Sequence, residues 1–484
     1  MAVVQTENRA ATLDLRAFLE CLEQQDPAGL LRVSGEVDPA RFEVTAVLQR
    51  LEDLNRYPAV LFERPLALDG RPAGMPILTN VFASRARCAR ALGLPAAAAG
   101  VELSLEYARR ETRRVAPLVV PASEAPVKEV VQVGDDVDLR RLPIVRHHRM
   151  DGGPYIDMTP ILRDPATGAY NVAFQRNQFR GPRKLGLHMS PRHNWQIARA
   201  FEQAGKPAPV AIVVGHHPAF YIGALNVSPF HADDYEVLGA IAGRPLRLVA
   251  SETWGDAFLV PADAEIVIEG EIPPGVREVE GPFGEYPGTY GPQRLRWVVE
   301  VKAITRRRQP IYQDTFVGHR EVSVLGAFPK EGSLLNRIRA VVPNVRAVHL
   351  PTSAAGRFHC YISLDKTGEG EAKQAALLAL GNVDFIKLVV VVDADIDVFR
   401  EEMVLWAVAT RVQADTDVDI VRNARSSQLD PSAREDNTGA KLVVDATKPA
   451  GRPFEERIEV PPEVVERVDL ARLVAPEHLR RLGL

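Results

Sequence analysis

The chain has few cysteines and no long apolar run, and each of these features excludes certain classes of protein. Only three cysteines occur among 484 residues, far apart and without a CxxC motif. That argues against a disulfide framework and against a thiolate metal site. Apolar runs such as Pro207–Gly215 and Leu388–Val392 are much shorter than the roughly 20 residues that span a bilayer. We therefore expect no membrane partner.

Several signals of location and partner are also missing. Residues 1–20 are mixed and charged, without the basic and apolar segments of a secretory signal. A formal net charge of -4 gives no reason to expect nucleic acid as a partner. The common nucleotide-binding and serine-hydrolase motifs, GxGxxG, GxxxxGK[ST] and GxSxG, are absent. With 46% apolar and 25% charged residues, the chain is expected to be a globular cytoplasmic enzyme.

Hydrophobic periodicity divides the chain into four parts and predicts an α/β fold. Residues 1–120 combine helical spacing with short strand-like runs, which indicates a small α/β domain. Residues 121–315 hold short β-type runs separated by Gly, Pro, Asn and Asp, as in an antiparallel sheet or split barrel. Residues 316–460 alternate strands and helices, which favours a second α/β domain. Residues 461–484 are typical of a charged helical tail.

Local patterns give more detailed expectations. Tyr170–Asn177 alternates like a single strand. Ser190–Gln203 is expected to be a helix with Ser190 as its cap and Pro191 at the first helical position. Another amphipathic helix is expected at Ser333–Val341. Val115–Glu129, rich in Pro, Ala and Val, is interpreted as a linker.

Two carboxylates bracket the segment Glu280-Gly-Pro-Phe-Gly-Glu285. Gly281 and Pro282 favour a turn, and the strand-like run Glu265–Gly270 precedes it. Loops that leave a sheet are a common location for catalytic groups. Two close carboxylates push their pKa values apart, so one can stay protonated while the other is charged. A solvated acidic turn is the alternative interpretation.

Asn171, His193 and Asp234 provide two oxygen donors and one nitrogen donor on separate predicted elements. Such a set suits Mg²⁺ or Mn²⁺. The spacing alone does not specify a metal site, because His193 can simply begin a helix and Asp234 can belong to a helix cap.

Two cations are candidates for anion binding. Arg176 can hold a substrate carboxylate or lower the pKa of a glutamate. Lys441 follows a loop of small residues and can contact a phosphate. A surface arginine and a solvated loop lysine are the alternatives.

Taken in chain order, these segments resemble the UbiD-like decarboxylases, which are reversible decarboxylases that use prenylated FMN. The resemblance covers the chain from about residue 12 to about residue 450. Its matching segments are Asn171 with Arg176, 190–197, 233–243, 260–270, 280–285 and 439–446.

The resemblance implies specific roles. The central barrel would bind prenylated FMN, with Mn²⁺ or Mg²⁺ on Asn171, His193 and Asp234 and K⁺ nearby. Relatives usually have Glu at the acidic ligand, so Glu236 is an alternative to Asp234. The implied cofactor contacts are Asn171, Val172, Ala173, Phe174, Gln175, Arg192, His193 and Lys441.

The implied reaction is loss of CO₂ from an aromatic, heteroaromatic or α,β-unsaturated acid through a covalent adduct with prenylated FMN. Arg176, Glu280 and Glu285 would be catalytic, with Glu285 as the proton donor. A flavin prenyltransferase would supply the cofactor. We expect a homodimer, and a hexamer is possible.

Two other functions stay open at this point: an FMN-dependent oxidoreductase and a non-catalytic subunit of a decarboxylase complex. Arg176, Glu280 and Glu285 argue against the second, because a binding subunit needs none of them. Met158, Leu325 and Phe328 are apolar candidates for the substrate-binding wall, and core packing explains them equally well.

Overall fold

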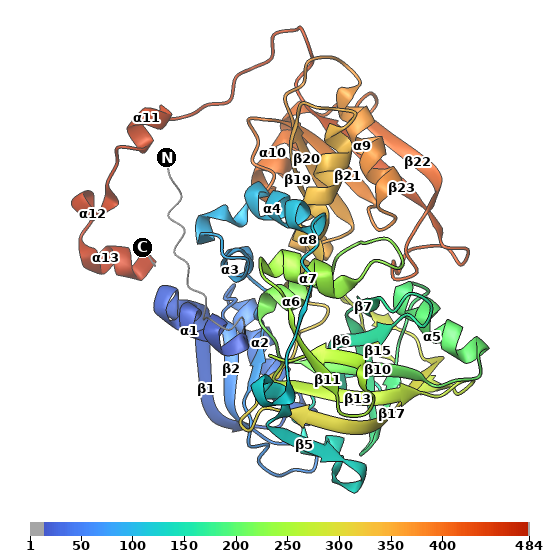
Figure 1. Cartoon of the computed structure of the whole chain (residues 1–484). Helices are drawn as coiled ribbons and strands as arrows, with labels where there is room; N and C mark the ends of the chain where they lie inside the picture. Colours follow the sequence, from blue (N-terminus) through green and yellow to red (C-terminus); the bar gives the residue numbers. More distant parts are fainter. Residues whose placement is uncertain (1–13, 483–484) are drawn as a thin grey trace.

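The centre of the molecule is a closed antiparallel β-barrel (Figure 1). The computed structural model describes residues 14–482. The barrel strands, in hydrogen-bonded order, are β10 (Ala208–Val214), β13 (Ile266–Ile272), β17 (Arg294–Arg306), β9 (Lys184–Leu187), β8 (Gln175–Gly181) and β6 (Tyr155–Arg163). Pairing of β10 with β6 closes the ring. The predicted α/β fold with a central barrel is confirmed.

Shorter elements surround the barrel. The strands are β5 (Val130–Val133), β7 (Tyr170–Val172), β11 (Arg247–Ser251), β12 (Gly255–Pro261), β14 (Glu278–Glu280), β15 (Phe283–Gly284) and β16 (Tyr290–Gly291). The helices are α5 (His193–Gln203), α6 (Pro218–Gly223) and α7 (Asp234–Ala242). Helix α5 contacts β6 and β10, which explains why β10 is buried at nearly every position. Strand β14, which ends at Glu280, pairs with the first residues of β17.

A four-stranded sheet lies beside the barrel (blue in Figure 1). It contains β1 (Leu30–Val37), β2 (Ala59–Pro65), β3 (Ile77–Thr79) and, from after the barrel, β18 (Tyr312–Gln313). Its helices are α1 (Leu15–Gln25), α2 (Glu43–Asp53), α3 (Arg85–Ala91) and α4 (Val101–Glu111). Since β18 pairs with β3, this sheet is fastened to the chain that leaves the barrel.

The C-terminal sheet has the order β19 (Val345–His349), β20 (His359–Leu364), β21 (Leu388–Asp393), β23 (Thr438–Ala446) and β22 (Val418–Arg425). Helices α9 (Glu371–Asn382) and α10 (Glu401–Arg411) pack on it. Strand β21 lies between two parallel neighbours. That position explains its nearly continuous apolar sequence.

Helix α8 (Arg320–Arg339) connects the barrel to the C-terminal sheet and packs against α4, α9 and β19. Figure 1 shows α4 and α8 between the two bodies. The predicted helix at Ser333–Val341 is therefore only the last part of a longer helix, which continues through Pro329. Proline disfavours helix interiors, but packing of α8 on three elements outweighs that local cost.

Three other local expectations were wrong. Tyr170–Asn177 is interrupted between Val172 and Gln175, where β7 ends and β8 begins. Helix α5 begins at His193 with Arg192 as its cap, so Pro191 lies outside it. Val115–Glu129 is more than a linker, because β4 (Leu118–Val119) within it pairs with β11.

The tail contains the short helices α11 (Pro462–Val465), α12 (Leu470–Leu473) and α13 (Pro476–Leu482), as its helical pattern predicts. Figure 1 shows it running beside the molecule, away from the C-terminal sheet. Across residues 14–482, no helix has the length and apolar character needed to cross a membrane.

Candidate active site

Arg176, Glu280 and Glu285 form one ionic cluster at the barrel. Arg176 lies on β8, Glu280 on β14, and Glu285 directly after β15. Nε and Nη2 of Arg176 each donate to an oxygen of Glu280 at 2.8 Å. Nη1 of Arg176 contacts Oε1 of Glu285. A single guanidinium thus joins both carboxylates of the acidic loop.

Backbone hydrogen bonds fix the loop between the two glutamates. Gly284 N donates to Oδ1 of Asp151 at 2.8 Å. Glu285 N donates to the carbonyl of Thr289 at 2.8 Å. A Cβ atom on Gly284 would lie 2.3 Å from Nδ1 of His148, so no larger residue fits there without displacing the ring. The loop therefore presents Glu285 from a fixed backbone.

The two glutamates differ in environment. Burial acts to raise the pKa of Glu280, but His188 and Arg176 lower it to about 2. The Glu280 side chain is 1% exposed, whereas that of Glu285 is 15% exposed. Glu280 is consequently an ionised partner of Arg176 at ordinary pH, and Glu285 is the more accessible acid.

A second polar cluster forms around Asn171, which lies five residues before Arg176 in the sequence. Nδ2 of Asn171 donates to Oδ1 of Asn194 at 2.8 Å. This bond turns Oδ1 of Asn171 toward Nδ1 of His193, 3.2 Å away. Burial, with Arg192 and His231, lowers the pKa of His193. The imidazole is therefore neutral near pH 7, the form that binds metals.

Asp234 lies at the same cluster. Its Oδ2 accepts a hydrogen bond from Val172 N at 2.8 Å, and its Oδ1 accepts one from Nδ2 of Asn226 at 3.0 Å. Burial raises the pKa of Asp234 to about 7 against these two bonds. A divalent cation would favour the charged carboxylate. The contact with Val172 links Asp234, rather than Glu236, to the neighbour of Asn171.

The donor set fits a hard cation. It would use the amide oxygen of Asn171, the imidazole of His193 and the carboxylate of Asp234, as Mg²⁺ and Mn²⁺ accept. Among the residues that the structure describes, no three His, Cys, Asp or Glu side chains gather in a metal-binding arrangement. Any site here therefore depends on Asn171.

The other predicted cofactor contacts are distributed unevenly. Val172, Ala173, Phe174 and Gln175 form the connection between the two clusters, and Oε1 of Gln175 accepts from Nδ2 of Asn194 at 3.3 Å. Arg192 caps α5 next to His193. Lys441 lies on β23 of the C-terminal sheet, where Nζ donates to the carbonyl of Asp384 at 3.2 Å. No described contact joins Lys441 to the Asn171 cluster.

Met158, Leu325 and Phe328 belong to the buried apolar core, in agreement with the core-packing alternative. Two residues of these clusters were not predicted from the sequence: Asp151, which holds the acidic loop, and Asn226, which holds Asp234. Neither residue belongs to a local motif. Each contacts its partner only in the folded structure.

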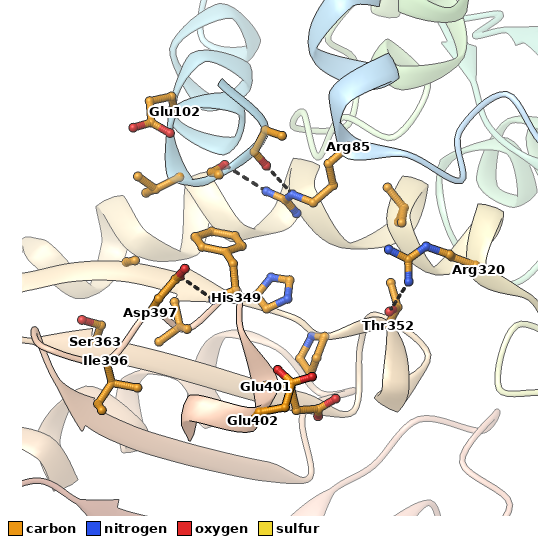
Figure 2. A pocket seen from close by; sticks show the side chains of 18 residues that line it. Arg85, Glu102, Arg320, His349, Thr352, Ser363, Ile396, Asp397, Glu401 and Glu402 are labelled. Carbon is orange, nitrogen blue, oxygen red and sulfur yellow. Dashed lines mark hydrogen bonds between the residues drawn. The ribbon is translucent and has the colours of Figure 1, made fainter. Parts of the chain in front are cut away.

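A cavity of about 680 Å³ lies elsewhere, between α3, α4, α8 and the C-terminal sheet (Figure 2). Arg85, Arg320 and His349 line it, and each already has a partner. Arg85 pairs with Glu331 at 2.9 Å, and His349 does so at 2.8 Å. Arg320 donates to Oγ1 of Thr352 at 3.2 Å. This cavity is separate from both clusters described above.

Comparison with known proteins identifies the class. Residues 119–320 match the family model of the 3-octaprenyl-4-hydroxybenzoate carboxy-lyase Rift-related domain. Residues 323–446 and 22–105 match the models of the C-terminal and N-terminal domains of the same enzymes. The chain is 34% identical over 474 residues to a phenolic acid decarboxylase of Sedimentibacter hydroxybenzoicus, with 94% of this chain and 96% of the relative covered.

Solved structures agree. The UbiD-class enzyme HmfF from Pelotomaculum thermopropionicum, in complex with FMN, is 40% identical with a TM-score of 0.88, covering 95% of this chain and 100% of that one. An evolved dimeric form of HmfF in complex with prFMN is 38% identical with a TM-score of 0.84, covering 96% and 100%. The fold and site thus define a carboxy-lyase. The chain belongs to the UbiD family of decarboxylases.

Proposed function

We propose that this protein catalyses the reversible, non-oxidative decarboxylation of an aromatic, heteroaromatic or α,β-unsaturated acid with prenylated FMN. The observation that carries the proposal is the bridging of Glu280 and Glu285 by Arg176. The segment with Arg176 also begins with Asn171, at the candidate metal cluster. The decarboxylase relative and the prFMN-bound HmfF form support this assignment.

Cofactor binding is assigned to the second cluster. Asn171, His193 and Asp234 would hold Mn²⁺, or Mg²⁺, with K⁺ nearby. The segment from Val172 to Gln175, with Arg192 and Lys441, would contact the flavin. Bound prenylated FMN supplies an electron sink for the carbanion that remains when CO₂ leaves.

The ionic cluster supplies the proton. Glu280, with its pKa lowered to about 2, keeps its charge and holds Nε and Nη2 of Arg176. Glu285 is the more exposed acid and serves as the proton donor. When Glu285 is protonated, its attraction to Nη1 of Arg176 weakens. That nitrogen is then available to orient the substrate carboxylate.

Two partners follow from this function. A flavin prenyltransferase would supply the cofactor, because prenylated FMN is not ordinary FMN. We propose a homodimer as the assembly, with a hexamer as the alternative. Molar mass in solution distinguishes the two assemblies from a monomer.

The test uses protein co-produced with a flavin prenyltransferase and supplied with Mn²⁺ and K⁺. The flavin absorbance spectrum is recorded, and CO₂ release or H/D exchange is followed over aryl, heteroaryl and acrylic acids. Turnover that disappears in Glu285→Gln supports the proposal. Oxidation of NAD(P)H by the loaded protein, without decarboxylation of any acid, would contradict it and favour an oxidoreductase.

A further inference from the structure

Lys330 is a half-buried cation on α8, and none of the described residues forms a salt bridge with it. Its Nζ donates to the carbonyl of Gly326, one helical turn earlier, at 3.0 Å. Within residues 14–482, no salt bridge to Lys330 is present. An ammonium group removed from water is costly unless it is paired. The side chain therefore has unused capacity for an anion.

Arg357 lies against the same turn of α8. A Cβ atom on Gly326 would lie 2.6 Å from Nη2 of Arg357. The guanidinium stacks on the ring of Tyr286 at 4.2 Å and on that of Phe385 at 5.5 Å. Its Nε is buried without a hydrogen bond, and no salt bridge to it is present in the described part of the chain. Stacking holds Arg357 in place while its donors stay available.

The electrostatics show that Lys330 and Arg357 are close enough to repel. Burial, together with the charges of Arg357 and Arg192 and against that of Glu111, lowers the pKa of Lys330 to about 7. Burial also lowers the pKa of Arg357, against Tyr286 and Glu285. The Glu285 effect places Arg357 within the field of the catalytic carboxylate. Tyr286, on which Arg357 stacks, directly follows Glu285 in the chain.

We infer that Lys330 and Arg357 bind a second acidic group of the substrate, remote from the carboxylate that is lost. This inference rests on the proposed decarboxylase function and names its substrate class: acids that carry a further carboxylate or phosphate-type group. A bound dianion offsets the mutual repulsion of the two cations and uses their free donors. The cations of the cavity in Figure 2 offer no such capacity, because each is already paired.

The test compares acids of matched size. Benzene-1,4-dicarboxylate, benzene-1,3-dicarboxylate and 4-phosphonobenzoate carry two acidic groups, and 4-carbamoylbenzoate carries one. Binding to the flavin-loaded protein is measured by calorimetry, and kcat/KM is measured for each compound that turns over. We expect at least one diacid to bind about tenfold more tightly than the amide. The phosphonate shows whether the second group is a carboxylate or a phosphate.

The test variants are Lys330→Met and Arg357→Met. The matched control is Lys302→Met, because this lysine lies near Glu271 and Glu300. Either test variant should remove the preference for diacids, and the control should keep it. Lys330→Met should also raise the unfolding temperature, because it removes a half-buried charge that has no salt bridge in the described part of the chain. That gain would show that the variant is folded.

Three results would overturn the inference. The first is equal binding of the diacids and the amide by the wild-type protein. This result would contradict the inference even if none of the compounds turned over. Retention of the diacid preference in either test variant is the second. Loss of flavin absorbance in Lys330→Met is the third, since it would assign the cation to the cofactor. Absence of turnover for every acid would instead contradict the proposed function.

Discussion

Two ionic clusters, one around Glu331 and one around Glu285, contain similar groups and differ in how completely those groups are paired. Glu331 is fully buried on α8 and accepts hydrogen bonds from Oγ of Ser104 at 2.7 Å and Leu350 N at 3.0 Å. Arg85 and His349 also pair with it. Burial would raise its pKa, but Arg85 and His349 lower it to about 2. Such a carboxylate cannot exchange protons near pH 7.

Glu285 has one described side-chain partner, Arg176, and a partly exposed carboxylate. Its neighbour Glu280 is held by two bonds and resembles Glu331 in pKa. The Arg176 cluster therefore combines one acid held by two hydrogen bonds, Glu280, with a less fully paired acid, Glu285. A cluster in which every charged group is fully paired serves to hold elements together. An acid with fewer partners, such as Glu285, can still bind or release a proton.

The largest expected effect comes from Glu285→Gln. The amide keeps the shape of the side chain but cannot donate the proton, so turnover should fall by about 10²–10⁴-fold. The unfolding temperature should stay near that of the wild-type protein, because Glu280 still neutralises Arg176. Single-turnover kinetics and a thermal melt measure both quantities.

Glu278→Gln is the matched control, since this glutamate lies on β14 and pairs with the half-buried Lys184 at 2.8 Å. Its turnover should be unchanged. If Glu285→Gln retained wild-type turnover, another group would have to be the acid.

Glu331→Gln should give the reverse result. Removing one partner of a buried charge pair typically destabilises a protein by about 3–5 kcal/mol. Turnover per folded molecule should be retained, because Glu331 lies in the structural cluster. Chemical unfolding measures the first effect, and active-site titration against flavin content measures the second.

Glu102→Gln provides the comparison, because Glu102 lines the same cavity but is exposed (Figure 2). Its effect should stay within about 0.5 kcal/mol. If Glu331→Gln changed the free energy of unfolding by a similarly small amount, the distinction between the fully paired Glu331 cluster and the less fully paired Glu285 cluster would be lost.

A smaller effect is expected at the candidate metal cluster. Asn226→Ala removes the hydrogen bond that orients Oδ1 of Asp234. Loss of such an outer partner typically weakens metal binding by about 10–100-fold. Titration with Mn²⁺ and measurement of flavin content test this. Asn382→Ala, at an exposed asparagine that accepts from Arg337 at 3.3 Å, should leave the affinity unchanged. Equal affinities in the two variants would argue against Asp234 as a ligand.

Much of the fold follows from local pattern. The β-branched runs at Val210–Val214 and Glu265–Glu269 become β10 and β13, because such residues suit a sheet covered on both faces. The closing pair, β10 with β6, joins segments about fifty residues apart. Nothing local specifies that pairing, so the sequence predicts a barrel without giving its closure. The predicted domain boundaries and the homodimer stay predictions.

The candidate site divides in the same way. The acidic loop is recognisable because Glu280 and Glu285 are five residues apart around Gly and Pro. Arg357 and Lys330 were missed, since one follows a turn and the other lies beside Pro329, where a helix was not expected. Only the packing of α8 and the stacking of Arg357 on Tyr286 bring these cations toward the loop that carries Glu280 and Glu285.

The smallest expected effect concerns pH. The pKa of Lys330 is lowered from 10.5 to about 7, so its ammonium is present below pH 7 and is lost as pH rises through that value. Bound diacid favours the ammonium, so diacid affinity should fall severalfold between about pH 6 and pH 8.5. Arginine guanidinium groups, which also act on Lys330, do not lose their charge in this range. Calorimetry at several pH values should show no such decline for 4-carbamoylbenzoate or for Lys330→Met. A diacid affinity that is constant across this range would show that Lys330 does not contact the second acidic group.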